Sequence, residues 1–272
     1  MRSSRRLIVE LLSAIPMRAT PVQELIRAAA ILDISANNLR VLLARLKRDG
    51  LIETTRRGHY RLGPEARAVQ QQVGTWREVE DQIRPWSGDW VAVHTGALGR
   101  SDRRATRARD RALRLLGFRQ LRNGLHVRPD NLLGSVSGIR DRLNKLGMER
   151  QALVCRLSCL DPTTESQALA LWDGDRLNAS YADMRSMLVA AAQRIAKLSS
   201  ESAAREAFLI GSEALRQIVL DPLLPEPIVD GARRARFFAE MRKFDALGRS
   251  YWESIMRPPL RTVSSQKEVA NV

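Results

Sequence analysis

The sequence is poor in the residues that build metal sites and disulfides, and it has no long apolar run. Of its 272 residues, two are cysteines and three are histidines. Cys155 and Cys159 cannot form a disulfide framework, and with the scattered histidines they lack the spacing of a zinc site. No apolar stretch approaches the roughly 20 residues that span a bilayer, and the N-terminus has no signal-peptide cleavage site. We therefore expect a cytoplasmic chain with no metal, no cofactor and no membrane partner.

Acidic residues are also scarce relative to basic ones. Lys and Arg number 45 against 30 Asp and Glu, which gives a formal net charge of +15. Of the 15 excess charges, 14 lie in residues 1–150, and residues 151–272 are nearly neutral. This asymmetry predicts that a polyanion meets the N-terminal half of the chain. The alternative is an arginine-rich surface that is only solvated.

The beginning of the chain has the pattern of three helices followed by a basic hairpin. After a first apolar helical repeat, Thr20 is expected to cap a second helix with Pro21 at its first position. Ser35 is expected to cap a third helix that ends at Gly50. Two short strands then flank the basic turn 56–58. This order of elements predicts a winged helix-turn-helix domain.

The third helix and the hairpin carry the candidate contacts to DNA. Asn can read adenine and Arg can read guanine by bidentate hydrogen bonds, whereas arginines on a wing meet phosphate or the minor groove. Two alternatives remain open, because a charged helix face can be merely solvated and some winged helices bind proteins. Only Asp49 and Glu53 interrupt the basic residues here, which favours phosphate. The predicted DNA-binding residues are Asn37, Asn38, Arg40, Val41, Arg45, Arg48, Arg56, Arg57 and His59.

The middle of the chain alternates between strand and helix patterns. Before it, Val69, Val73, Trp76, Val79 and Ile83 recur at roughly heptad spacing, which predicts a helical connector. Beyond it, the order of elements is βαββαβ, with an Asn-Gly hairpin turn, and this order predicts a ferredoxin-like domain. Helical patterns follow to the end. The expected strands are 90–93, 118–121, 125–128 and 152–157, and the expected helices between them are 102–117 and 131–146.

Taken together, these patterns predict an α+β fold of several domains, each with enough apolar residues for a core. The expected parts are a winged helix-turn-helix domain (1–66), a helical connector (67–87), a ferredoxin-like domain (88–160), a helical C-terminal domain (161–258) and a flexible tail (259–272).

A second basic feature lies in the expected helix 102–117. Its arginines fall on one stripe, opposite a face of alanine and leucine. The stripe could contact DNA beside the main site, bind the phosphates of a nucleotide-containing ligand, or be a solvated surface. It consists of Arg103, Arg104, Arg107, Arg111 and Arg114.

An enzyme is the alternative class of function. A metal-dependent nuclease built on the middle domain needs an acidic residue at the end of its first strand. That strand ends at His94, and no carboxylate follows before Asp102. The sequence also has no glycine-rich phosphate loop and no G-x-S-x-G elbow with its serine nucleophile. We therefore expect no catalytic residues and no enzymatic activity.

Four segments in order carry a resemblance to a known family: Asn38–Leu51, Arg114–Pro129, Leu171–Tyr181 and Leu220–Pro225. Over residues 5–255 the chain resembles the PaaX family of bacterial transcriptional repressors. This resemblance implies a winged-helix DNA-binding domain, a middle domain similar to the small CRISPR adaptation nuclease, and a helical C-terminal domain.

The resemblance also implies partners. Members of the family are typically homodimers that an aryl- or acyl-coenzyme A thioester releases from a double-stranded DNA operator. We hypothesise that such an effector lies between the middle and C-terminal domains, against aromatic residues and balanced by arginines. The candidate ligand-binding residues are Arg107, Arg111, Trp172, Tyr181 and Trp252.

Overall fold

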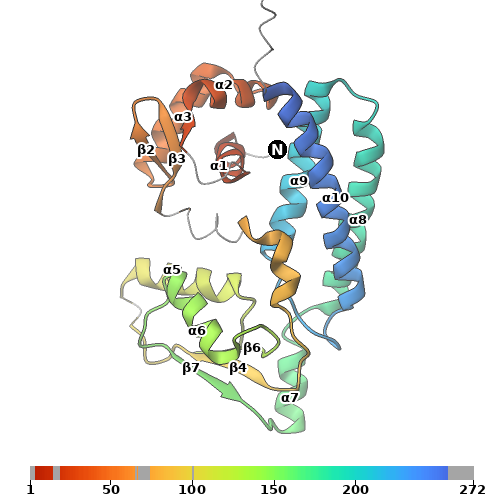
Figure 1. Ribbon diagram of the computed structural model, residues 1–272. Coiled ribbons are helices and arrows are strands. Elements are labelled where there is room, and N and C mark those ends of the chain that lie inside the picture. Colours follow the sequence, from red (N-terminus) through yellow and green to blue (C-terminus); the bar gives the residue numbers. More distant parts are fainter. Residues whose placement is uncertain (1–3, 15–18, 65, 67–73, 100, 257–272) are drawn as a thin grey trace, which may run out of the picture.

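The computed structural model describes residues 4–14, 19–64, 66, 74–99 and 101–256. The chain forms an N-terminal module, a middle part built on a sheet, and a set of long helices that runs alongside the N-terminal module and reaches the middle part (Figure 1). This mixed architecture, with two small antiparallel sheets and a helical C-terminal region, agrees with the expected α+β class. The expected tail, 259–272, lies outside the described residues.

The N-terminal module packs three helices against a three-stranded antiparallel sheet with strand order β1-β3-β2. The module has its own core, in which Ile8, Leu25, Leu39 and Leu46 are fully buried. Each helix contributes one apolar stripe, as its periodicity predicts. The elements are α1 (Ser4–Ala14), β1 (Thr20–Pro21), α2 (Val22–Ile31), α3 (Ala36–Arg48), β2 (Ile52–Arg56) and β3 (His59–Leu62).

The predicted ends of α3 are confirmed. The Ser35 hydroxyl accepts a hydrogen bond from the Asn38 amide at 3.3 Å, so it caps the helix as expected. After the helix, Gly50 has a φ of +70°, the left-handed conformation that glycine adopts most easily. These two residues fix where α3 begins and ends.

The expectation for Thr20 is wrong. Thr20 does not cap α2, because it belongs to β1 and pairs with Tyr60 of β3. Val22 donates its amide to the Gly58 carbonyl at 2.7 Å, which holds the start of α2 against the hairpin. Thr20 is 1% exposed, and its hydroxyl has no hydrogen-bond partner among the described residues.

The described part of the connector is a 3-10 helix, η1 (Trp76–Gln82), and not a heptad-repeat α-helix. Val69 and Val73 lie outside the described residues. Trp76 is 3% exposed and belongs to the large core, and the partly buried Val79 and Ile83 pack against the same core. An ion pair between Glu80 and Arg242, at 2.9 Å, also holds η1 against the long C-terminal helix.

The middle part is a four-stranded antiparallel sheet with strand order β5-β6-β4-β7 and two helices. The expected elements are all present, and their boundaries differ from the expected ones by a few residues at most. Gly124, in the expected Asn-Gly turn, has a φ of +74°. The elements are β4 (Trp90–His94), α5 (Arg103–Leu115), β5 (Arg119–Arg122), β6 (Leu125–Pro129), α6 (Ser135–Lys145) and β7 (Leu153–Leu157).

The helical part contains α7 (Pro162–Leu169), α8 (Gly174–Ile195), α9 (Ser200–Val219) and α10 (Gly231–Met256). Helices α8, α9 and α10 pack side by side (Figure 1). The middle and helical parts share one continuous core, whereas the N-terminal module has a separate one. Phe208 of α9 and Trp252 of α10 pack against that separate core. The helical part therefore contacts both of the others.

A buried arginine joins the middle part to the helical part. Arg128 is 1% exposed and donates to the Leu116 carbonyl, to the Asn131 side chain and to the Pro222 carbonyl in the segment between α9 and α10. Asn131 in turn donates to the Leu223 carbonyl at 2.7 Å. Burial lowers the pKa of Arg128 to about 9, and carbonyl acceptors satisfy its guanidinium where no water can.

Candidate nucleic-acid interface and ligand cavity

Helix α3 presents a polar face to solvent opposite its buried leucines. With 3.6 residues per turn, burying Leu39, Leu43 and Leu46 turns the intervening positions outward. Val41 is the one large apolar side chain exposed on this helix, at 45%. The predicted contact residues on the helix, all exposed, are Asn37, Asn38, Arg40, Val41, Arg45 and Arg48.

The positive charge on this face is only partly neutralised. Asp49 forms an ion pair with Arg5 at 2.9 Å and lies 3.6 Å from Arg48. Arg40 and Arg45 have no ion-pair partner in the described part of the chain. Two cations on α3 are therefore available to an external anion.

The hairpin between β2 and β3 holds the other predicted contacts. Arg56 is within hydrogen-bond distance of the His59 ring, at 2.9 Å, and the other ring nitrogen of His59 lies 3.2 Å from the Arg57 carbonyl. Arg61 is paired with Glu53 at 2.5 Å. The guanidinium of Arg57 is exposed and has no partner among the residues described. The structure thus brings the predicted residues of α3 and the hairpin into one module with several unpaired cations.

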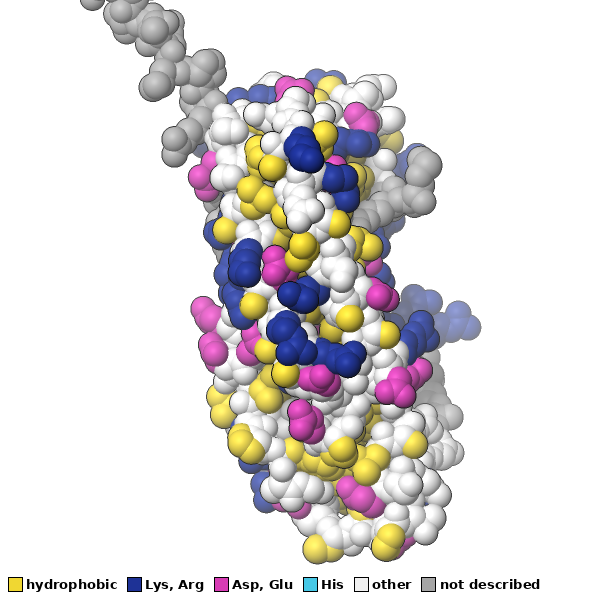
Figure 2. Space-filling view, turned by 90° about the vertical axis from the view of Figure 1, so that its right-hand side faces the viewer, with side chains coloured by type: hydrophobic (Ala, Val, Ile, Leu, Met, Phe, Trp, Pro, Cys, Tyr) yellow, Lys and Arg dark blue, Asp and Glu magenta, His cyan; other side chains and the backbone are white. Residues whose placement is uncertain are grey.

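The side of the molecule formed by α8 and α10 has a different character. Basic and acidic side chains are intermixed there (Figure 2). Such a surface has no continuous positive field for a polyanion to follow. The distribution agrees with the near-neutral charge of residues 151–272.

The arginines of α5 do not form a single surface. Arg103, Arg104 and Arg107 are exposed, whereas the half-buried Arg111 and the exposed Arg114, one to two turns further along, border a large cavity. The stripe predicted from the sequence is therefore divided between two environments.

Sequence reasoning missed Arg109, which lies on the inner side of the same helix. It is 5% exposed, forms an ion pair with Glu149, and donates to the Gly99 carbonyl at 3.0 Å. The hydrogen bond from Arg109 lowers the pKa of Glu149, and the same contact raises the pKa of Arg109. The spacing in the sequence could have indicated its burial, because Arg109 lies on the same helix face as Ala105 and Ala112.

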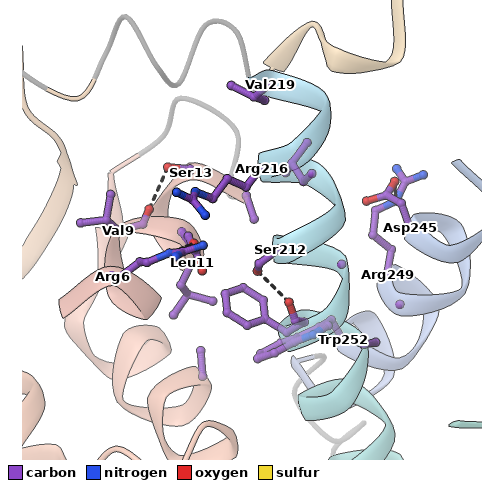
Figure 3. A pocket seen from close by; sticks show the side chains of 18 of the residues that line it. Arg6, Val9, Leu11, Ser13, Ser212, Arg216, Val219, Asp245, Arg249 and Trp252 are labelled. Carbon is purple, nitrogen blue, oxygen red and sulfur yellow. Dashed lines mark hydrogen bonds and ion pairs between the residues drawn. The ribbon is translucent and has the colours of Figure 1, made fainter. Parts of the chain in front are cut away.

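The cavity lies where all three parts of the chain meet. Its volume is about 950 Å³. Its walls come from α1 and α2 of the N-terminal module, from α5 of the middle part, and from α9 and α10. In the close view, Arg6 of α1 and Arg216 of α9 extend toward the same space (Figure 3). Most of the lining is apolar, but six arginines and four carboxylates also border it.

Comparison with known families identifies one of these parts. Residues 172–254 match the family model of the PaaX-like protein C-terminal domain. The match spans α8, α9 and most of α10, so this region is similar to a PaaX-like C-terminal domain and is called the PaaX-like domain below. The resemblance expected from the sequence is thus confirmed for this region, and it indicates a transcriptional regulator.

A solved structure is similar to nearly the whole chain. It is the uncharacterized protein Rv0674 from Mycobacterium tuberculosis, with 20% sequence identity and a TM-score of 0.55. The similarity covers 92% of this chain and 99% of that one, so the two proteins share an overall fold. No curated protein matches the sequence.

The residues predicted to bind an effector lie in several places. Arg111 and Trp252, which belongs to the PaaX-like domain, line the cavity. Arg107 is exposed and does not line it. Trp172 stacks on Trp90, 6.1 Å between ring centroids, and borders a smaller hollow of about 570 Å³ beside α8.

Tyr181, the remaining predicted effector residue, lies in the core of the PaaX-like domain. It is 1% exposed and stacks on Phe237 at 6.2 Å between ring centroids. Asp221 lies beside it, and burial raises the pKa of both groups. The structure therefore brings together two of the five predicted residues, Arg111 and Trp252.

Two negative findings concern metals and membranes. The described residues contain no group of three or more His, Cys, Asp or Glu side chains placed to hold a metal ion. Asp102, the first carboxylate after β4, caps α5 by accepting from the amides of Arg104 and Ala105. Across the same described ranges, no helix combines the length and the apolar character that crossing a membrane requires.

Proposed function

We propose that this protein is a ligand-responsive bacterial transcriptional repressor, acting on a catabolic operon and binding a pseudo-palindromic operator as a homodimer. The observation that carries the proposal is the outward face of α3, where Arg40 and Arg45 are unpaired, next to a hairpin that exposes Arg57. The match of residues 172–254 to a regulator family supports the same function.

In this proposal the N-terminal module is a winged helix-turn-helix. Helix α3 enters the major groove, with Asn37, Asn38 and Arg40 near its N-terminal end facing base edges. The turn of the hairpin is the wing, and Arg57 meets phosphate or the minor groove. The order of three helices followed by two antiparallel strands supports this reading.

The middle part is proposed to be a ferredoxin-like domain. Its element order is βαββαβ, and the strand order β5-β6-β4-β7 places the first and third strands at the centre. Each helix returns the chain to a strand two positions away in the sheet, which is the split βαβ arrangement. This domain shares its core with the helical part, and its helix α5 lines the same cavity as α1 and α2 of the N-terminal module.

The proposed effector is an aryl- or acyl-coenzyme A thioester that releases the repressor from DNA. This class of ligand comes from the PaaX resemblance. A set of thermal-shift measurements with coenzyme A thioesters tests it, because a ligand that binds only the folded state raises the melting temperature. If no thioester raises the melting temperature, this effector class is wrong.

Sequence-specific binding is tested by selecting bound duplexes from a random library with the full chain, followed by anisotropy titrations at several salt concentrations. Arg40→Ala should weaken binding to the selected duplex by about 1–3 kcal/mol and relax the preference at one base pair. Arg57→Ala should weaken all duplexes alike and lower the salt slope by about one.

Arg61→Ala is the matched control for the hairpin. Arg61 lies on β3 and is already neutralised by Glu53, so its loss should change the salt slope less than the loss of Arg57. A dimer predicts an inverted repeat in the selected sequences and a dimer mass in sedimentation. DNA binding by α3 and the hairpin is wrong if no sequence is enriched or if Arg40→Ala and Arg57→Ala bind like the wild type.

A further inference from the structure

We propose that the cavity at the junction of the three parts binds an apolar molecule carrying one anionic group, and that its occupancy changes how the N-terminal module rests on α9 and α10. The binding step stands by itself, whereas the effect on DNA rests on the function proposed above.

The size and position of the cavity fit a small ligand. Its volume of about 950 Å³ is within the range of sites that enclose metabolites and cofactors. Five helices from three parts of the chain form its walls, so a bound molecule would contact all of them.

The apolar wall is built mainly by α9 and α10. Phe208 and Trp252 meet edge to face at 5.8 Å between ring centroids. The indole N–H of Trp252 donates to the Ala204 carbonyl at 3.0 Å, so its polar atom is satisfied within the protein. Gly211 also lines the cavity without a side chain, and a Cβ there would touch the Phe244 ring at 3.7 Å. This surface suits an alkyl or aromatic group.

Two arginines of α5 indicate that the ligand carries an anionic group. Four of the six arginines around the cavity have carboxylate partners, including Arg249 with Asp245 at 3.3 Å. Arg111 and Arg114 have neither an ion-pair nor a hydrogen-bond partner among the described residues. The half-buried Arg111 is less screened than an arginine in open water, so it binds a carboxylate, sulfonate or phosphate more strongly. The exposed Arg114 adds a second guanidinium about one turn further along α5.

The cavity wall is also the contact between the N-terminal module and the helical part. Leu25 and Ala28 of α2 face the cavity from one side, and Phe208 and Trp252 face it from the other. The same two aromatic residues pack against the core of the N-terminal module. A ligand that enters here occupies space between α2 and α9, and it therefore favours one placement of α3 over another.

The probe for binding is 8-anilinonaphthalene-1-sulfonate, an aromatic anion that fluoresces in apolar sites, titrated into the full chain. Decanoate should displace it, and decanol, which lacks the charge, should displace it at least tenfold less effectively. Decanoyl-coenzyme A in a third titration distinguishes a free acid from a thioester as the source of the anionic group.

Two pairs of substitutions on one helix separate the cavity from general surface charge. Arg111→Gln with Arg114→Gln should weaken decanoate binding at least tenfold. The control, Arg103→Gln with Arg107→Gln, removes the same charge from the N-terminal end of α5, where neither residue borders the cavity, and should leave decanoate binding unchanged. A Cβ at Gly211 meets only ordinary contacts, at 3.7 Å and beyond, so Gly211→Leu does not force the backbone apart. Its side chain adds bulk to the cavity wall and should block binding of the probe.

The outcomes separate this inference from the proposed function. The cavity is not the site if the Arg111/Arg114 double variant or Gly211→Leu binds the probe like the wild type. If decanoate binds in the cavity but does not change the anisotropy titration with selected DNA, the regulatory step is wrong and the binding step stands. If the wild type binds no DNA, the proposed function fails, and the probe titrations still decide whether the cavity binds an anion.

Discussion

The substitution Gly117→Ala tests the joint between the middle and helical parts. Gly117 follows α5 with a φ of +72°, and its carbonyl accepts the indole N–H of Trp172 at 3.2 Å. A Cβ atom at this position would lie 2.8 Å from the Cβ of Pro222 and 2.9 Å from its Cα. Since Pro222 is fixed by its ring and its backbone, one of the two segments must move.

Two terms contribute to the expected loss of stability. An alanine in the left-handed region is strained by about 1–2 kcal/mol, of which the reduced entropy of the unfolded chain offsets up to about 1 kcal/mol. The contact with Pro222 adds about 1–3 kcal/mol of overpacking. Gly117→Ala should therefore lower the free energy of unfolding by about 2–4 kcal/mol.

Gly147→Ala is the matched control within the same sheet domain. Gly147 follows α6 as Gly117 follows α5, and it has a φ of +92°. The amide after each glycine closes the preceding helix, from Phe118 to Leu113 and from Met148 to Leu143.

The two glycines differ in their neighbours. The nearest atom to a Cβ at Gly147 is the Ala108 methyl group at 3.4 Å, so this substitution should lower the free energy of unfolding by only about 1 kcal/mol. Urea unfolding followed by tryptophan fluorescence and circular dichroism measures the difference. The reasoning fails if the two variants lose equal stability, because the contact with Pro222 would then contribute nothing.

Two more changes test single contacts. Ser35→Ala removes the hydroxyl that accepts the Asn38 amide at the start of α3. It should lower the free energy of unfolding of the N-terminal module by about 1 kcal/mol, measured by thermal denaturation. Ser13→Ala is the control, because the Ser13 hydroxyl donates only to the Val9 carbonyl within α1. Glu149→Gln should lower it by about 1–3 kcal/mol at pH 7, because the buried Arg109 loses its charged partner. The Arg109 contact lowers the pKa of Glu149, so the stabilisation is present above the ordinary glutamate range and is lost as the pH falls through the depressed pKa. The difference between wild type and Glu149→Gln in urea titrations should therefore shrink as the pH falls through the depressed pKa of Glu149, and a difference that stays constant down to acid pH would contradict the assignment.

The elements with local causes could be predicted from the sequence. Helix α3 has an apolar repeat, a serine at its start and a glycine after its end, and each of these signals acts within a few residues. The Asn123-Gly124 turn likewise fixes the hairpin of β5 and β6 by itself. These features needed no knowledge of the rest of the chain.

Contacts between distant segments could not be predicted in the same way. Thr20 has the residue type of a helix cap, but Tyr60 of β3 offers a strand partner 40 residues away, and the tertiary pairing prevails. Trp172 and Tyr181 have the residue types of a ligand site, but both bury their rings against other aromatic residues. An aromatic side chain gains the same apolar contact from a core as from a ligand, so composition alone does not separate the two.

The arginines of α5 show most clearly what position in the fold adds to residue type. Periodicity places Arg103, Arg107, Arg111 and Arg114 on one stripe, and in the structure only Arg111 and Arg114, in its second half, border the cavity that α1 and α9 also line. Distance along the helix axis, about 1.5 Å per residue, then decides whether a cation borders the cavity. Because these side chains are chemically identical, only their surroundings separate a surface available to a phosphate backbone from a site for a small anion. Comparing the 111/114 and 103/107 double variants in both the DNA and the decanoate titrations therefore measures the effect of position alone.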